Sequence, residues 1–256
     1  MSRLARSPTD RGTKEVIFLP RKRLFKWIRR IFLLALLAAL CALGVLVYEG
    51  YALYRDALAE QSLEDRAADI RSNPSYTVLS DLPQTYLDAV VAVEDHRFYQ
   101  HFGVDVFSIG RAVWQNLTTQ SLAEGGSTIT QQLAKNLYFT QDKEFVRKIA
   151  EAFMALHIER SYGKDVILEL YVNSIYFGDG YYCVRDASLG YFGKEPIEMT
   201  NYECTLLAGI PNAPSVYAPT VNPDLAAQRQ RHVVAQMVEN GYLTQEEADA
   251  IVADAG

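Results

Sequence analysis

A long apolar run near the N-terminus constrains the fold of this chain more than any other feature. Residues 31–48 read IFLLALLAALCALGVLVY, which is eighteen residues without a charge, and they lie between Arg29-Arg30 and Glu49. A helix of this length and composition can span the hydrocarbon core of a bilayer. The run therefore predicts a single transmembrane anchor over residues 31–48.

A cleaved signal peptide is the alternative interpretation of the same run, but its apolar core would be shorter, and no convincing cleavage site follows. Residues 1–30 hold ten Lys and Arg side chains against two acidic ones, a charge of +8. Because the whole chain carries −6, the remainder carries −14. Basic flanks stay in the cytoplasm, so we expect a basic cytoplasmic leader over residues 1–30 and everything after the anchor outside. An acidic main domain argues against nucleic acid as a partner.

Beyond the anchor, residues 49–75 predict a helical stalk and linker, and residues 76–256 a globular domain. No strand-like alternation of apolar and polar residues occurs, whereas helical periodicity recurs throughout. The class is therefore expected to be mainly α. The predicted helices are Tyr86–Glu94, Val104–Leu117, Ser127–Leu137, Lys143–Arg160, Asp165–Phe177, and three more that begin near Thr200, Asn222 and Thr244.

The stretch from Glu94 to Gly103 reads EDHRFYQHFG and ends an apolar helical run. Two adjacent carboxylates followed by aromatic rings provide a candidate general base at a helix end, with rings to desolvate it. Taken alone, the Glu94-Asp95 pair would more often be a solvated helix terminus.

The stretch from Gly125 to Asn136 reads GGSTITQQLAKN. Two glycines lead into hydroxyl side chains at a predicted helix start, an arrangement that offers N–H and O–H groups to a phosphate-like anion. An ordinary serine N-cap is the simpler alternative, and the Gly-Lys-Ser/Thr order of a P-loop is missing.

Four motifs follow one another along the chain. They are Glu94, Asp95, Phe98, His101 and Gly103; Gly126 to Gln132 with Lys135 and Asn136; Arg147 and Lys148 with Glu151; and Glu169 to Asn173 with Phe177, Gly178 and Gly180. In order and spacing they resemble the motifs of glycosyltransferase family 51, the peptidoglycan glycosyltransferases, which occur as monofunctional enzymes and as N-terminal domains of class A penicillin-binding proteins. The resemblance covers about residues 76–240.

The resemblance implies a lysozyme-like helical transferase domain in the bacterial cytoplasmic membrane, with its catalytic part outside. The implied substrates are lipid II and a lipid-linked glycan strand. The 4-hydroxyl of an incoming lipid II would attack the anomeric carbon of the strand, form a β-1,4 linkage with inversion and release undecaprenyl pyrophosphate. The bilayer is an implied partner, and other cell-wall synthesis proteins are further candidates.

Residue by residue, the resemblance makes Glu94 the general base and Glu151 a second catalytic carboxylate. Glu151 would either orient nearby cations or help to bind a divalent cation, Mg²⁺ or Mn²⁺, which is the one cofactor considered. The expected substrate-binding residues are Ser127, Gln132, Lys135, Lys143, Arg147, Lys148 and Arg229. Asp95, Phe98, His101 and Gly103 are expected to be site scaffolding, and Tyr171, Asn173 and Phe177 packing and helix-end residues.

Two departures from the family pattern stand out. Residues 183–188 read CVRDAS where the family usually has a glycine followed by alanines, and Lys143 stands where many members have an arginine. A glycan-cleaving hydrolase also needs placed carboxylates and is the alternative enzyme. A non-catalytic wall scaffold on the same fold is the alternative without chemistry. Ser161 and Lys164 fit S-x-x-K, but no Lys-Thr-Gly follows, so a penicillin-binding site is not expected within this sequence.

Overall fold

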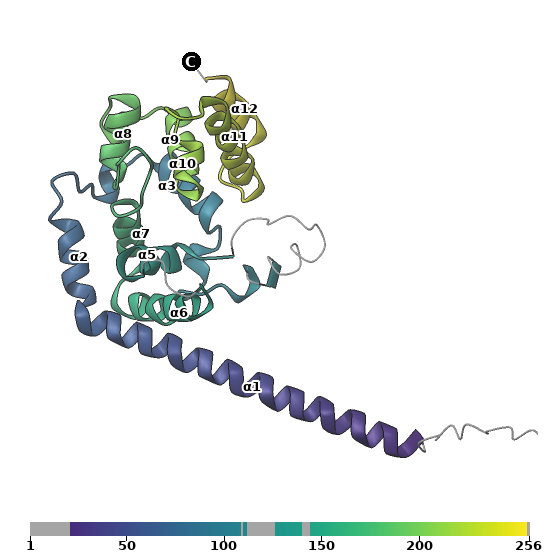
Figure 1. Cartoon of the computed structure of the whole chain (residues 1–256). Coiled ribbons are helices and arrows are strands. Elements are labelled where there is room, and N and C mark those ends of the chain that lie inside the picture. The colour runs from purple at the N-terminus through teal and green to yellow at the C-terminus, as the bar shows by residue number, and fades with distance from the viewer. Residues whose placement is uncertain (1–20, 109, 112–125, 140–143, 255–256) are drawn as a thin grey trace, which may run out of the picture. The chain divides into compact units, whose positions relative to one another are not determined.

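A computed structural model describes residues 21–108, 110–111, 126–139 and 144–254 of the chain (Figure 1). Helices account for its regular structure, and within these ranges the only β-type pairings are isolated bridges, Phe102 with Val104 and Gly178 with Tyr181. The predicted mainly α class is confirmed. The α-helices are α1 (Arg21–Glu60), α2 (Leu63–Arg71), α3 (Gln84–Glu94), α5 (Ile129–Tyr138), α6 (Glu144–Ser161), α7 (Lys164–Val172), α8 (Val184–Phe192), α9 (Asn201–Gly209), α10 (Pro214–Tyr217), α11 (Pro223–Glu239) and α12 (Gln245–Ala253). Short 3₁₀ turns lie at Leu79–Asp81, Phe98–Gln100, Pro196–Glu198 and Ile210–Asn212.

The chain divides into two compact units, Met1–Val45 and Leu46–Gly256. In the first unit the described residues all belong to α1, and its leucines are exposed. Among the described residues, α1 is the one helix that is long and apolar enough to cross a membrane by length and composition. Exposed leucines on a lone helix fit a lipid environment, in agreement with the predicted anchor.

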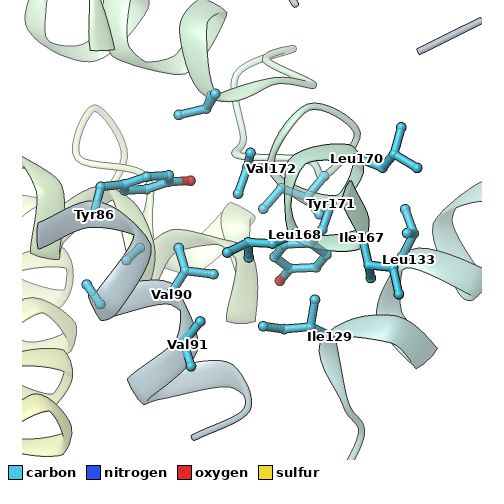
Figure 2. Close-up of a cluster of buried hydrophobic side chains, with 14 of the residues drawn as sticks. Tyr86, Val90, Val91, Ile129, Leu133, Ile167, Leu168, Leu170, Tyr171 and Val172 are labelled. Atoms are coloured by element: carbon cyan, nitrogen blue, oxygen red, sulfur yellow. The ribbon is translucent and has the colours of Figure 1, made fainter. Parts of the chain in front are cut away.

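The core of the second unit lies between α3, α5, α7, α9 and α11, which pack against one another. Figure 2 shows Tyr86, Val90 and Val91 of α3 opposite side chains of α7, with Ile129 and Leu133 of α5 beside them. These side chains are almost completely buried, and each contributes about 1.5–3 kcal/mol of hydrophobic stabilisation. Leu63 and Ala67 of α2 belong to the same core, so packing of the domain begins before Tyr76.

The fourth motif differs from the expectation. The helix predicted over Asp165–Phe177 ends at Val172 instead, with Asn173 as its C-cap. Asn173 Oδ1 accepts a hydrogen bond from Thr77 N at 2.8 Å, and its Nδ2 donates to Thr77 O at 2.8 Å. This pairing stops the helix because it holds Asn173 against a segment ninety-six residues away in the chain.

Residues 183–188, which depart from the family pattern, begin a helix that the sequence analysis did not predict. Cys183 is the N-cap of α8, and its sulfur accepts a hydrogen bond from Asp186 N at 3.4 Å. Cysteine is not among the preferred N-cap residues, which is why the helix start was missed. Of the predicted helix Val104–Leu117, residues 106–108 and 110–111 are helical, whereas Val104 lies in the isolated bridge with Phe102 and Asp105 is not helical. Residues 109 and 112–117 lie outside the described residues, as does Lys143.

Candidate active site

Glu94 is the last residue of α3 and lies in a largely enclosed position, with its side chain 8% exposed. Gln132 Nε2, from α5, donates a hydrogen bond to Glu94 Oε2 at 2.6 Å. Arg229 Nη2, from α11, lies 4.0 Å from Glu94 Oε1. Three helices therefore converge on this carboxylate, and a carboxylate held in one orientation suits a general base.

Tyr171 extends this arrangement by one residue. Its hydroxyl donates a hydrogen bond to Gln132 Oε1 at 3.2 Å, and its side chain is completely buried. Burial raises the pKa of Tyr171 well above its ordinary value, so the hydroxyl keeps its proton and remains a donor. Because the Gln132 carbonyl accepts from Tyr171, its amide N–H faces Glu94. The predicted role of Tyr171 was packing alone, and no pattern in the sequence indicated its contact with Gln132.

The four residues expected to be scaffolding link the end of α3 to α5 and α6. Asp95 accepts a hydrogen bond from Ile129 N at 3.1 Å, and His101 Nε2 lies 2.8 Å from its carboxylate. Phe98 is completely buried. Gly103 has φ +82°, and a Cβ on it would lie 3.0 Å from Ala155 O of α6. The turn after Glu94 is thus held close against both helices.

A cationic group on α6 lies near the start of α5. Glu151 is completely buried and pairs with two cations of its own helix, Arg147 Nε at 3.1 Å and Lys148 Nζ at 2.7 Å. Lys148 Nζ also donates to Ser127 Oγ at 3.1 Å. Since Lys148 contacts both Glu151 and Ser127, the carboxylate holds this ammonium group at the predicted anion-binding helix start.

A groove brings most of the expected site residues together. It is lined by Val93, Glu94, Ser127, Gln132, Lys135, Lys148, Pro211, Asn212 and Arg229. Arg147 and Glu151 do not line it. The groove joins one carboxylate to three cationic side chains, which suits proton transfer beside a bound anion.

A second hollow opens beside the same carboxylate. It is lined by Glu94 and His96, by Ser108 and Arg111, by Gly126 to Thr128, and by Gln236, Glu239 and Asn240 at the end of α11, among others. Burial, reinforced by the charge of Arg111, lowers the pKa of His96, which favours its neutral form. No motif in the sequence marked the α11 residues, because they lie about 140 positions after Glu94. Glu94 can therefore be approached from two directions.

Another contact without a sequence signal anchors the segment that follows Gly103. Asp105 is almost completely buried, and Arg97 Nε donates to its carboxylate at 2.9 Å. Although burial opposes ionisation, the hydrogen bonds from Arg97 and Ser108 lower the pKa of Asp105 well below its ordinary value. Asp105 also accepts from Phe107 N at 2.9 Å. It acts as an N-cap for the helical residues 106–108, near the second hollow.

The donor set around Glu151 does not fit the considered divalent cation. Both of its oxygens face cationic side chains, so a metal ion there would meet two positive charges. Within the described residues, no group of three or more His, Cys, Asp or Glu side chains is arranged to hold a metal ion.

A largely enclosed carboxylate beside three cationic side chains is, at the level of class, an arrangement that suits group transfer with an anionic substrate. Comparison with known proteins is more specific. Residues 62–238 match the family model described as Transglycosylase. The chain belongs to this family, and the resemblance to glycosyltransferase family 51 is confirmed.

Two named relatives support the same family assignment. The chain is 38% identical to penicillin-binding protein 1F of Bacillus subtilis (strain 168) over 236 residues, which are 89% of this chain and 33% of that protein. It is 46% identical to penicillin-binding protein 1A of Neisseria lactamica over 174 residues, 68% of this chain and 22% of that protein. The chain thus spans a third or less of these relatives. A crystal structure of penicillin-binding protein 1A from Haemophilus influenzae matches 71% of this chain and 17% of its own, at 23% identity and a TM-score of 0.42.

Proposed function

We propose that this domain polymerises lipid II into β-1,4-linked glycan strands and releases undecaprenyl pyrophosphate. The observation that carries the proposal is the position of Glu94, a largely enclosed carboxylate held by Gln132 where two hollows meet. One hollow is the groove that contains Lys135, Lys148 and Arg229. Membership of the transglycosylase family supports glycosyl transfer as the reaction.

In the proposed reaction, Glu94 accepts the proton of the acceptor's 4-hydroxyl while that oxygen bonds to the anomeric carbon of the donor. The bond from that carbon to the pyrophosphate oxygen breaks at the same time, and the bonding pair leaves with the pyrophosphate. Attack on the face opposite the leaving group inverts an α-linked donor to a β product. A sugar hydroxyl is a weak nucleophile, and a positioned base contributes about 10²–10⁴-fold to such a step.

The two hollows suit two substrates. We assign the donor's pyrophosphate to the cationic groove, where Lys135, Lys148 and the Ser127 hydroxyl would stabilise the charge that develops on it. The acceptor sugar then lies in the second hollow, near His96 and Gln236. Glu151, which also pairs with Arg147, holds Lys148 in place without lining the groove itself. A hydrolase would not need this cationic groove.

The anchor fits this substrate, because lipid II is held in the bilayer by its prenyl chain. We propose a single pass over residues 31–48 of the bacterial cytoplasmic membrane, with the basic leader inside and the domain outside. Contacts with other cell-wall synthesis proteins are a further prediction of the same placement.

The test compares full-length wild type with Glu94→Gln in detergent, using labelled lipid II and gel separation of products. Glu246→Gln, an exposed glutamate on α12, is the matched control. We expect a ladder of glycan chains from wild type and the control, and a rate at least about a hundredfold lower from Glu94→Gln. Each reaction is repeated with EDTA. We expect the ladder to persist, because the cationic side chains of the groove would stabilise the charge of the pyrophosphate without a metal ion.

The alternatives predict different products. Shortening of added glycan strands without any ladder would identify a hydrolase. Neither ladder nor cleavage from wild type, with or without added Mg²⁺ or Mn²⁺, would contradict the proposal and favour a scaffold. A ladder lost only in EDTA would restore a role for a divalent cation.

A further inference from the structure

Past the proposed membrane span, α1 continues into the second unit and meets α6 at Gly50, which is buried. A Cβ on Gly50 would lie 2.6 Å from Ile149 Cγ2, 2.7 Å from Ile149 Cβ and 3.1 Å from Val146 O. Real Cβ atoms do not approach other atoms this closely, and a change of the Ile149 rotamer cannot move its own Cβ. Only glycine permits this crossing.

Helix propensity gives no reason for a glycine at this position. In a helix interior, glycine is about 1 kcal/mol less favourable than alanine. Gly44, in the same helix, has no atom within 4 Å of its would-be Cβ. Gly50 therefore differs from Gly44 by its contact with α6, not by its place in α1.

Aromatic side chains stabilise the crossing on one side. The rings of Tyr51 and Phe153 lie 5.4 Å apart in an edge-on arrangement, and the rings of Tyr54 and Phe153 6.0 Å apart. Tyr54 Oη lies 3.3 Å from His157 Nδ1. These contacts join one face of α6 to the outer end of α1.

A neighbouring face of α6 is packed into the core. Ala150, Met154 and Ile158 are completely buried. Since interiors are close-packed, an extra atom at position 50 can be accommodated by α6 only through a strained shift or rotation against this core. Lys148 precedes Ile149, so a shift or rotation of α6 moves its ammonium group away from Ser127.

The crossing and the site also share a surface. An apolar groove is lined by Val47 of α1 and by Ile149 and Phe153 of α6, among others. Ser127 and Lys148 line it too, and they also line the cationic groove. A displacement where α1 crosses α6 would therefore also shift Ser127 and Lys148, which lie at the proposed pyrophosphate position.

We propose that Gly50 is a positioning residue for the active site: it lets α1 seat against α6 closely enough to hold Lys148 beside Ser127. The part of α1 that follows the proposed membrane span then contributes to the geometry of the active site. The inference rests on the proposed function for its activity readout alone.

The experiment is a double-variant cycle on the full-length protein, with initial rates of lipid II polymerisation at saturating substrate. The variants are Gly50→Ala, Ile149→Gly and the pair, and Gly44→Ala is the matched control. We expect Gly50→Ala to lower kcat about tenfold, and Gly44→Ala to stay within about twofold of wild type. In the Ile149→Gly background, Gly50→Ala should lower kcat less than about twofold, because the Ile149 side-chain atoms that the new Cβ would strike are absent.

A second readout does not depend on turnover. Hydrogen–deuterium exchange should increase in peptides covering residues 126–139 and 144–161 of Gly50→Ala, and not in Gly44→Ala. Thermal unfolding at least 10 °C above the assay temperature verifies that each variant is folded. Exchange and kcat unchanged in Gly50→Ala, or an equal loss in both backgrounds, would overturn the inference. If wild type makes no glycan, the proposed function fails and the exchange measurement alone decides the role of Gly50.

Discussion

At the scale of single residues, the orientation of Glu94 depends on a short chain of hydrogen bonds. Tyr171 donates to Gln132, and Gln132 donates to Glu94. A half-turn of the amide would present its carbonyl to the carboxylate, which has no proton to donate, and the bond to Glu94 would be lost. The tyrosine hydroxyl favours the observed orientation further, because it donates to the carbonyl.

Replacement of Tyr171 by phenylalanine tests this arrangement. We expect Tyr171→Phe to lose about 1 kcal/mol of unfolding free energy through the missing hydrogen bond, and about tenfold in kcat because Gln132 is free to turn. Tyr191→Phe is the control, since its hydroxyl donates to Phe177 O at 2.8 Å, away from the groove. Urea unfolding and initial rates should show similar stability losses for both variants, with full activity in the control. Equal activity in both would refute an orienting role for Tyr171.

At the scale of elements, the start of α5 is fixed by a reciprocal cap. Thr128 Oγ1 accepts from Gln131 N at 3.1 Å, and the Gln131 side chain accepts from Thr128 N at 3.1 Å. The Thr128 hydroxyl also donates to Gly103 O at 2.6 Å. One side chain thus begins the helix that carries Gln132 and joins it to the turn that follows Glu94.

We therefore expect removal of this cap to affect both stability and catalysis. Thr128→Ala should cost about 1–2 kcal/mol of unfolding free energy and lower the polymerisation rate, whereas Thr128→Ser should restore both. Thr244→Ala removes the equivalent cap of α12 and should cost a similar stability with no loss of rate. Chemical denaturation beside initial rates separates the two effects. A rate loss in Thr244→Ala of the same size would mean that general instability explains the result.

At the scale of the whole molecule, several tyrosines hold their protons more tightly in the folded state. Burial raises the pKa of Tyr76, Tyr99 and Tyr138 to about 12, and that of Tyr86 and Tyr171 well above the ordinary 10.0. In the unfolded chain these groups ionise near pH 10. Between pH 10 and 12 the folded state consequently binds more protons than the unfolded state.

The sign of this difference predicts alkaline destabilisation. The contribution is fully present below pH 10 and is lost as the pH rises, by about 1.4 kcal/mol per pH unit for each fully buried tyrosine. The midpoint of urea unfolding should fall steadily from pH 10 to pH 12, and the slope should be smaller in Tyr86→Phe. Tyrosinate absorbance should rise together with unfolding. Ionisation of all tyrosines before unfolding would contradict the prediction.

Local patterns in the sequence were sufficient for much of this fold. The apolar run, the periodicity of α3 and α6, and the capping boxes at Thr200 and Thr244 each depend on residues within a few positions of one another. Local patterns do not predict the end of a helix that is set by contact with a segment far away in the sequence. The helix α7 ends earlier than predicted because Asn173 pairs with the remote Thr77. The start of α8 is a local exception, since its N-cap is a cysteine, which is not among the preferred N-cap residues.

By itself, the sequence determined the family, the long apolar helix, the helical class and the chemical groups available for the site, because these follow from ordered motifs and from local composition and spacing. Only the tertiary structure decided which groups meet: Tyr171 with Gln132, Lys148 with Ser127, and Gly50 with Ile149. Each pair joins different elements and depends on how closely two packed segments approach. That approach is set by the shapes of many side chains at once, so no local stretch of sequence encodes it.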